Sequence, residues 1–365
     1  MPFAKLAQAY ERFLLNNASQ ISSIESTVRS LTYVLPGRFS DADVASEGLY
    51  ALLNVLGLYH DHILTKAARQ TSSAKPDTSL LNRYHRYFFR HSAQPGLYQR
   101  LGLALTLLQF AESFIEMAIQ KKWGTRAKWQ AVTAIELAKL LCRLALIRNT
   151  QNRMLFQPSY PERDVDPEVL RASTNTETPP SAWQGKHTGK QYPSVASLAQ
   201  GVREGQPLAQ YISARSSQPE QYLKPSEVVL PLSRSALLGE YLFALRPVLY
   251  VLAIRKWGHK AWLPWLLSLA IESLSRLLQT TACADVTRQG HSGSRSQLER
   301  AELGRRLWLF LNYLLRSPFY DRFTKPRLDR FIKSAQQKPI ISLFAGLLSD
   351  YQPLWESVYF YTSGS

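Results

Sequence analysis

The residues best suited to chemistry in this sequence are the triplet His60-Asp61-His62, because imidazole and carboxylate groups are common metal ligands. The surrounding sequence has a helical pattern, and adjacent side chains on a helix point in different directions. No second cluster of ligands is apparent elsewhere in the sequence. We therefore expect no metal site and no cofactor.

Charged residues also recur at helical spacing inside apolar sequence. Glu112 and Glu116 lie one turn apart, and we expect them to meet basic neighbours rather than to act as a general acid and base. Glu136, Lys139 and Arg143 follow at spacings of three and four, so they form one polar stripe. Such a stripe can face a neighbouring helix, a water-filled groove or lipid headgroups.

The usual signatures of catalysis are missing from the sequence. It has no glycine-rich phosphate-binding loop, no Gly-x-Ser-x-Gly elbow and no zinc-type cysteine pair. We therefore predict that the protein is not an enzyme. The alternative is a membrane-embedded lipid enzyme, which would lose lipid turnover when Glu112 or Glu136 is replaced.

The charge of the chain indicates an anionic partner. Its 44 Lys and Arg residues outnumber 27 Asp and Glu residues, which gives a formal net charge of +17. That charge attracts nucleic acid or an acidic lipid surface. A nucleic-acid-binding protein is the alternative interpretation. The sequence argues against it, because the basic residues are scattered along apolar helices and no recognised nucleic-acid module appears. The two cysteines, Cys142 and Cys283, lie in apolar sequence and indicate a reduced compartment.

The chain divides into three parts. Residues 1–150 and 228–361 have helical periodicity, whereas 151–227 is rich in Pro, Ser, Thr and Gln without periodicity. The predicted fold is all-α, a multi-helix membrane-associated protein whose two helical halves are joined by a disordered linker.

Two apolar stretches, 127–149 and 232–254, approach the roughly 20 residues that a membrane span requires. The interior of the first, 129–147, is interrupted by Glu136, Lys139 and Arg143, and the second is interrupted by Arg234, Glu240 and Arg246. A charge at the centre of a span costs about 2.5–3.5 kcal/mol. We expect these stretches to cross the membrane. The alternative is a monotopic helical domain on the cytosolic face, buried to headgroup depth.

A short pattern occurs beside each candidate span: Lys122-Trp123-Gly124 and Lys256-Trp257-Gly258. Each pattern suits a helix end, with Lys in the last turn and Gly as the stop. Trp beside Lys is also typical of a membrane interface. The candidate interface residues are Trp123, Trp129, Trp257, Trp262 and Trp265. Flanking Lys and Arg residues place both Trp-Gly corners, and hence both termini, in the cytosol.

Basic and aromatic residues alternate between Arg83 and His91, where Arg83, Arg86 and Arg90 are suited to bind phosphates. A simpler interpretation is a helix with one aromatic face in the core and one solvated basic face.

Six segments distributed along the chain resemble the peroxin sixteen family of peroxisomal membrane-assembly proteins, in the same order. They are Leu31-Thr32-Tyr33-Val34-Leu35-Pro36-Gly37-Arg38-Phe39 with Ser46-Glu47-Gly48-Leu49-Tyr50; Glu112-Ser113-Phe114-Ile115-Glu116-Met117; Gly239-Glu240-Tyr241-Leu242 with Arg246-Pro247; Trp257-Gly258 with Trp262 and Trp265; Leu314-Leu315-Arg316-Ser317-Pro318-Phe319-Tyr320-Asp321-Arg322-Phe323; and Asp350-Tyr351-Gln352-Pro353-Leu354-Trp355.

The resemblance implies a non-enzymatic peroxisome biogenesis factor that docks peroxin three and serves the import of peroxisomal membrane proteins. It implies residence in the peroxisomal membrane, reached by way of the endoplasmic reticulum. It also implies that the import receptor, peroxin nineteen, recognises a basic stretch matched here by Lys66, Arg69 and Lys75, and we extend this candidate surface to Arg83, Arg86 and Arg90.

The candidate partner contacts lie in the string near the C-terminus: Arg316, Phe319, Tyr320, Asp321, Arg322 and Phe323. Replacement of Phe319, Tyr320 and Phe323 by Ala is expected to abolish function.

Overall fold

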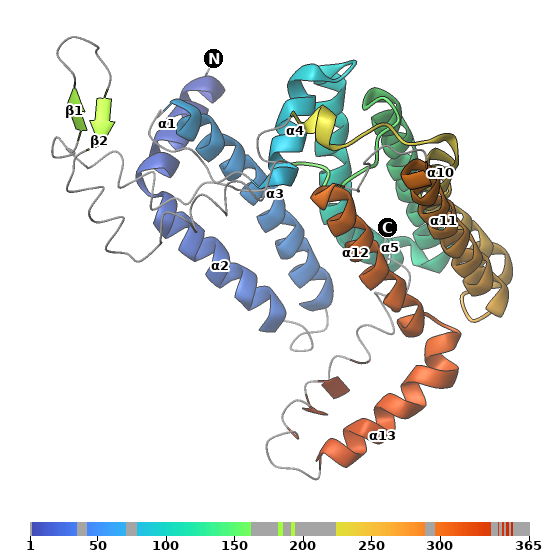
Figure 1. Ribbon diagram of the computed structural model, residues 1–365. Coiled ribbons are helices and arrows are strands. Elements are labelled where there is room, and N and C mark those ends of the chain that lie inside the picture. Colours follow the sequence, from blue (N-terminus) through green and yellow to red (C-terminus); the bar gives the residue numbers. More distant parts are fainter. Residues whose placement is uncertain are drawn as a thin grey trace.

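The computed structural model describes residues 2–34, 42–70, 79–161, 182–184, 191–193, 224–288 and 296–336, with a few positions between 342 and 352. Its elements, shown in Figure 1, are α1 (Pro2–Asn16), α2 (Ala18–Val34), α3 (Ala42–Gln70), α4 (Leu80–His91), α5 (Pro95–Asn149), β1 (Ala182–Gln184), β2 (Gln191–Pro193), α9 (Pro225–Val228), α10 (Arg234–Trp257), α11 (Trp262–Arg288), α12 (Gln297–Phe310), the 3₁₀ helix η2 (Leu311–Leu315), the π-helix η3 (Tyr320–Thr324) and α13 (Lys325–Gln336). The all-α class is confirmed. The sequence analysis did not expect β1 and β2, which are three residues each and pair antiparallel.

Serine side chains start three of the helices. Ser79 accepts a hydrogen bond from the backbone N–H of Asn82 at the start of α4, and Ser233 caps α10 in the same way. At α12, Ser296 and Glu299 form a complete capping box, in which each side chain accepts a bond from the other residue's backbone N–H. These bonds satisfy backbone donors that the first helical turn leaves free.

Helix α5 is a helical hairpin. It reverses at Gly124, whose φ of +82° lies in the region that favours glycine. The two arms are joined along their length: Lys128 pairs with Glu116 at 2.7 Å near the turn, and Asn149 donates to the carbonyl of Gln94 at 3.0 Å at the open end. The apolar stretch 127–149 of the sequence analysis corresponds to the second of these arms.

Helices α10 and α11 form a second hairpin around Gly258, which has a φ of +86°. Gly239 allows the two helices to approach closely, because an added Cβ there would lie 2.9 Å from the carbonyl oxygen of Ser275. The hydroxyl of Ser275 in turn donates to the carbonyl of Gly239 at 2.7 Å. Both Lys-Trp-Gly patterns therefore mark the turn of a helical hairpin.

The second arm of α5 packs antiparallel against α10. Leu140, Ala244 and Val248 form one cluster, and Arg255 donates to Thr133 at 3.2 Å near the turns. Both Trp-Gly turns consequently lie at the same end of the bundle, the lower end in Figure 1.

Residues 151–161 belong to the core, although the sequence analysis began the linker at residue 151. Met154 and Phe156 are buried against Tyr84 and Phe88 of α4. Gly102 leaves room for this irregular segment, because a Cβ there would lie 2.7 Å from the carbonyl oxygen of Ser159. The rest of the expected linker, apart from β1, β2 and residues 224–227, lies outside the described residues.

The buried side chain of His85 connects three segments of this core. Its Nδ1 accepts from the hydroxyl of Tyr98 at 2.9 Å, and its Nε2 donates to the carbonyl of Pro158 at 2.9 Å. Burial lowers the pKa of His85 to about 4, against the smaller raising effect of the bond to Pro158. Burial acts on Glu116 in the opposite direction and raises its pKa to about 7, although the hydrogen bond and the charge of Lys128 lower it.

These two groups have opposing effects on acid stability. Between pH 6.5 and about 4 the unfolded chain binds a proton at His85 that the folded chain does not, so stability falls as the pH falls. Between about pH 7 and 4.5 the folded chain binds a proton at Glu116 first, so stability rises. As the pH falls from about 7 to about 5, the free energy of unfolding of Glu116→Gln should therefore decrease more steeply than that of the parent, by up to roughly 1.4 kcal/mol per pH unit. That of His85→Gln should decrease less steeply than that of the parent. Thermal unfolding of the purified proteins across that range measures the slopes; equal slopes for all three proteins would contradict the assignment.

Candidate membrane and partner surfaces

The buried carboxylates of α5 meet basic groups, as the sequence analysis expected. Lys139, which is 0% exposed, bonds to Glu112 on the other arm and to Glu136 at 3.1 Å. The stripe of Glu136, Lys139 and Arg143 is buried and faces neighbouring helices. These ion pairs hold the arms together, which is a structural role for the carboxylates.

A second buried ionic cluster joins α10 to α12. Arg306 contacts both carboxylate oxygens of Glu240, at 2.7 and 2.8 Å, in a bidentate pair. It also donates to Glu302 at 2.9 Å and to the carbonyl of Leu155 at 3.0 Å. The side-chain amide of Gln279 on α11 also donates a hydrogen bond to the carboxylate of Glu240, at 3.0 Å. One guanidinium therefore connects α10, α12 and the segment after α5.

A third cluster joins the two helices of the α10–α11 hairpin. Glu272 lies between Arg246 of α10 and Arg276, the latter at 2.8 Å. Arg276 also donates to the backbone carbonyl of Arg306 and so brings α12 beside α11. Four of the charged residues that interrupt the apolar stretches are thus paired inside the bundle: Glu136, Lys139, Glu240 and Arg246.

Within the described residues, one helix is long and apolar enough to cross a membrane. This helix is α10, Arg234–Trp257, with a mean hydropathy of 1.6 over its best window, of which 56% is buried in the protein. The other candidate stretch, 127–149, does not meet the same criterion, since it contains Glu136, Lys139 and Arg143. Length and composition alone are weak evidence for a span, because a buried core helix passes the same test.

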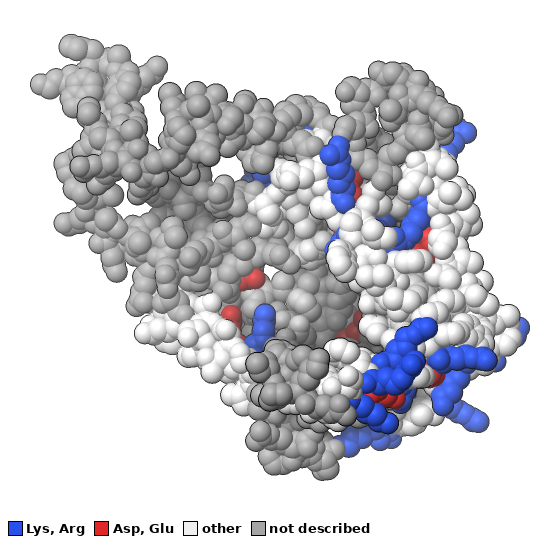
Figure 2. All heavy atoms as spheres, turned by 60° about the horizontal axis from the view of Figure 1, so that its bottom comes forward, with Lys and Arg blue, Asp and Glu red and all other residues white. Residues whose placement is uncertain are grey.

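The two Trp-Gly turns present aromatic and basic side chains to solvent. Trp123 is 63% and Trp257 47% exposed, and each has the preceding Lys over its ring, at 4.8 and 4.6 Å from the centroid. Figure 2 shows Lys and Arg side chains gathered at this end of the bundle. The exposed basic residues of the turns are Lys121, Lys122, Arg126, Arg255, Lys256 and Lys260.

The other three candidate interface tryptophans are less accessible. Trp265 is buried and donates to the carbonyl of Tyr313 at 3.1 Å, so the structure contradicts its placement at an interface. Trp129 packs partly buried against the cluster of Val132 and Tyr250. Trp262, which is half-buried, packs edge-on against Trp265.

A row of leucines covers the outer face of α11. Their spacing places them on one side of the helix, and each is exposed by 38% or more. We call this row the α11 leucine face; its members are Leu263, Leu266, Leu267, Leu274 and Leu277. Contiguous exposed apolar surface of this kind is typical of a membrane or protein contact.

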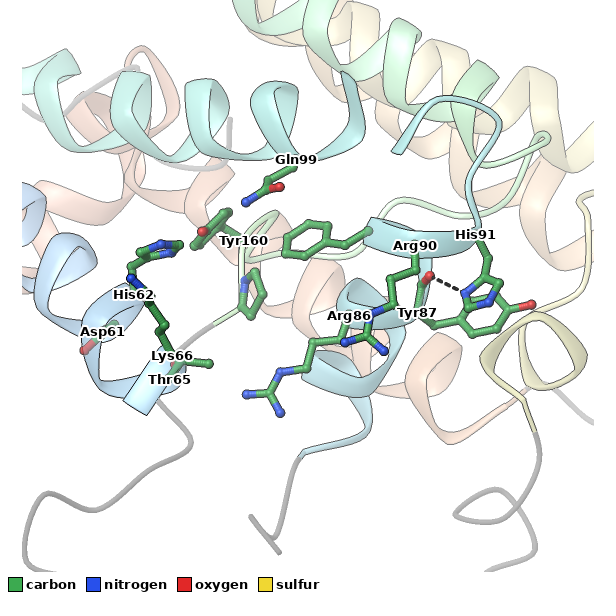
Figure 3. A pocket seen from close by; sticks show the side chains of 12 residues that line it. Asp61, His62, Thr65, Lys66, Arg86, Tyr87, Arg90, His91, Gln99 and Tyr160 are labelled. Atoms are coloured by element: carbon green, nitrogen blue, oxygen red, sulfur yellow. Dashed lines mark hydrogen bonds between the residues drawn. The ribbon is translucent and has the colours of Figure 1, made fainter. Parts of the chain in front are cut away.

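Of the predicted basic residues, the structure brings together Lys66, Arg86 and Arg90. They line a pocket of about 760 Å³ between the end of α3 and α4, closed by Gln99 of α5 and by Tyr160 (Figure 3). Arg83 lies on the same helix but does not line the pocket. The side chains of Arg69 and Lys75 lie outside the described residues.

Helix α4 has the two faces that the simpler interpretation predicts. Tyr84, His85 and Phe88 are buried, whereas Arg90 and His91 are exposed. In the metal-like triplet, both ring nitrogens of His60 are hydrogen-bonded, Nε2 to the hydroxyl of Tyr10 at 2.7 Å and Nδ1 to the carboxylate of Glu25. Among the described residues, no three His, Cys, Asp or Glu side chains come together as metal ligands would.

The candidate partner segment is partly turned inward. Arg316 and Tyr320 are buried, and Phe319 stacks on Trp265 at 5.5 Å. Asp321 accepts a hydrogen bond from Ser317 at 2.7 Å. Asp321, Arg322 and Phe323 are exposed, so the surface that this segment offers to a partner is smaller than the sequence analysis predicted.

Replacement of Phe319, Tyr320 and Phe323 by Ala would therefore combine two effects, the loss of stability from a buried ring and the loss of an exposed contact. Tyr320→Ala should destabilise the protein by about 3–5 kcal/mol and lower its abundance, because Tyr320 is 0% exposed. Phe323→Ala should leave abundance unchanged, because the ring is 40% exposed. Immunoblotting of both variants in cells measures abundance. Normal amounts of Tyr320→Ala would contradict the buried placement.

Sequence reasoning missed Arg306, Glu272 and the pocket. A charged residue inside an apolar helix signals the need for a partner, but its spacing does not identify a partner on another helix. Proximity between Lys66 and Arg86 likewise depends on how α3 and α4 pack.

The comparisons with known proteins cover nearly the whole chain. A family model described as "Peroxisomal membrane protein (Pex16)" matches residues 8–357. A protein of Arabidopsis thaliana named "Peroxisome biogenesis protein 16" is 25% identical over 98% of this chain and 100% of its own length. "Peroxisome biogenesis factor 16" of Dictyostelium discoideum is 25% identical over 97% of each chain. "Peroxisomal membrane protein PEX16" of Schizosaccharomyces pombe is 20% identical over 92% of each.

No solved structure matches the chain significantly. The family match extends from α1 into the segment beyond α13 and includes both hairpins with their Trp-Gly turns. The chain therefore belongs to the Pex16 family of peroxisomal membrane proteins.

Proposed function

We propose that this protein acts at the peroxisomal membrane as a docking factor for peroxin three in the import of peroxisomal membrane proteins. Family membership supports a role in peroxisome biogenesis and a location in the peroxisomal membrane. The near full-length match to biogenesis proteins of a plant and an amoeba is the observation that carries the proposal. Its mechanism is binding rather than turnover, consistent with the structural use of the buried carboxylates.

The proposed attachment to the membrane is monotopic, on the cytosolic face. A span over 127–149 would place residue 85 on one side of the bilayer and residue 158 on the other, yet His85 and Pro158 are bonded at 2.9 Å. The two arms of α5 are also paired along their length, so they favour one common environment. This packing supports the monotopic alternative over two crossings. In the proposed attachment to the cytosolic face, both termini would be cytosolic.

The α11 leucine face is the proposed membrane-contacting surface. Its leucines would enter the apolar boundary of the leaflet, while Trp257 and the basic residues of the turn remain at the headgroups. Buried ion pairs then stay inside the bundle, where they are shielded from lipid. We propose that the protein reaches peroxisomes by way of the endoplasmic reticulum.

For the partners, the proposal assigns peroxin nineteen to Arg69, Lys75 and Arg83, the basic candidates other than the three that line the pocket, and peroxin three to the exposed part of the 316–323 segment. Asp321, Arg322 and Phe323 provide the accessible contacts there.

Complementation tests the function. Expression of this chain in cells that lack peroxisomes, because their own family member is deleted, should restore organelles that import a fluorescent matrix marker. Arg322→Ala with Phe323→Ala should reduce both that restoration and co-precipitation of peroxin three at unchanged abundance. Failure of the unaltered chain, when it is correctly membrane-bound, would refute the assembly role.

A further inference from the structure

We propose that the pocket between α3 and α4 binds a phosphate group carried on a hydroxylated ring, as in the headgroup of a phosphorylated phosphatidylinositol. Neither the family match nor the docking role assigns a small-molecule site to this chain. The pocket volume of about 760 Å³ lies within the roughly 300–1,000 Å³ of small-molecule sites.

The charges that line the pocket favour a dianion. Lys66, Arg86 and Arg90 contribute three positive charges, and Asp61 contributes one negative charge, so the lining carries a net charge of +2. A phosphate monoester carries a charge of about −1.5 to −2 at neutral pH, which matches this lining.

The geometry of the cations suits phosphate in particular. Arg86 and Arg90 are one helical turn apart on α4, and Lys66 approaches from α3 on the other side (Figure 3). A guanidinium binds two phosphate oxygens in a fixed fork, and a Lys ammonium adds a compact third charge. Contact with a flat, negatively charged surface would not require cations on two opposing walls of a pocket, whereas an inserted phosphate group meets both walls.

Neutral polar groups occupy the rest of the lining. Thr65, Gln99 and Tyr160 provide hydroxyl and amide groups that can both donate and accept hydrogen bonds. Ring hydroxyls need such neutral partners, whereas an inorganic phosphate does not. The aromatic ring of Phe89, 5.8 Å from that of Tyr160, gives the pocket an apolar side against which a ring can lie.

One wall of the pocket is already held in place. His91 stacks on Tyr87 with their ring centroids 4.5 Å apart, and its Nδ1 donates to the Tyr87 carbonyl at 3.1 Å (Figure 3). The opposite side of α4 is anchored by the buried His85. A ligand would therefore meet a preformed surface rather than order it, which favours affinity.

The test is calorimetric titration of the purified full-length protein with three probes: inositol 1,4-bisphosphate, a short-chain phosphatidylinositol 4-phosphate and inorganic phosphate. We expect saturable binding of the first two, stronger than that of inorganic phosphate. Arg86→Gln and Arg90→Gln should each weaken it by about tenfold or more. Arg100→Gln, an exposed position next to Gln99 that does not line the pocket, is the matched control and should bind as the parent does.

The probes also identify the source of the ligand. Tighter binding of the lipid than of the inositol bisphosphate indicates a membrane headgroup, and equal binding indicates a soluble inositol phosphate. No saturable binding, equal losses in Arg100→Gln, or preferential binding of an acidic peptide would each overturn the proposal. Because the titration requires neither peroxin three nor cells, its failure is distinguishable from a failure of the docking function.

Discussion

Replacement of Arg306 by Met is expected to lower the free energy of unfolding by about 3–5 kcal/mol, because it leaves Glu240 as a buried, unpaired carboxylate. Arg306 is 4% exposed and connects α10, α12 and the segment after α5. A loss of this size is a large part of the typical 5–15 kcal/mol stability of a domain. The variant should therefore unfold at a lower temperature and accumulate poorly in cells.

The neighbouring residue provides the control. Arg305 bonds to the same carboxylate, Glu302, but its side chain is 33% exposed, so Arg305→Met should cost less than about 1 kcal/mol. The double variant Glu240→Leu with Arg306→Met removes the unpaired charge and should recover part of the stability. Thermal unfolding of the purified variants measures all three effects. Equal losses in Arg305→Met and Arg306→Met would show that burial of the pair does not matter.

Replacement of four members of the α11 leucine face by Gln is expected to release the protein from membranes. Burial of a whole leucine side chain contributes about 1.5–3 kcal/mol, and these side chains, Leu263, Leu266, Leu274 and Leu277, are each roughly half exposed. Each should then contribute on the order of 1 kcal/mol to insertion. Together they should shift the partition between membrane and solution by roughly a thousandfold. Flotation of the purified variant with liposomes measures this partition.

A second exposed apolar row supplies a matched control. Leu52, Val55, Leu56 and Tyr59 have the same helical spacing on α3. Their replacement by Gln should leave flotation unchanged if the α11 leucine face is the membrane contact. Release of the α3 variant with retention of the α11 variant would move the membrane contact to the N-terminal helices.

The sequence predicts the helical elements better than their partners. Glycine after Lys-Trp predicted both helix ends, because a positive φ at Gly124 and Gly258 is a local property. Spacing also placed Glu136 and Lys139 on one polar face of a helix, but it left open whether that face meets a neighbouring helix, a groove or lipid headgroups. Pairing of Glu240 with Arg306 spans 66 positions, and no periodicity in either helix specifies it.

The segment after the first helical region shows a second limit of prediction from the sequence. Prolines at 158 and 161 and the loss of periodicity indicated a linker from residue 151, yet Met154 and Phe156 fill a gap in the core. Irregular backbone can pack as tightly as a helix when its side chains fit. The orientation of Tyr320, in a short π-helix, was unpredictable for the same reason.

The two borders of the chain's middle segment are fastened together. Arg153 donates to the carbonyl of Val229 at 2.9 Å, and Asn152 accepts from the backbone N–H of Leu232 at 2.9 Å. The ends of the intervening sequence are thus fixed at one point, whatever lies between them. Doubling the length of a closed loop costs only about 0.6 kcal/mol, so evolution can lengthen, shorten or replace this insert at little energetic cost. For engineering, the same clasp makes the middle segment the natural place to insert a reporter domain or to divide the chain into two fragments that reassemble.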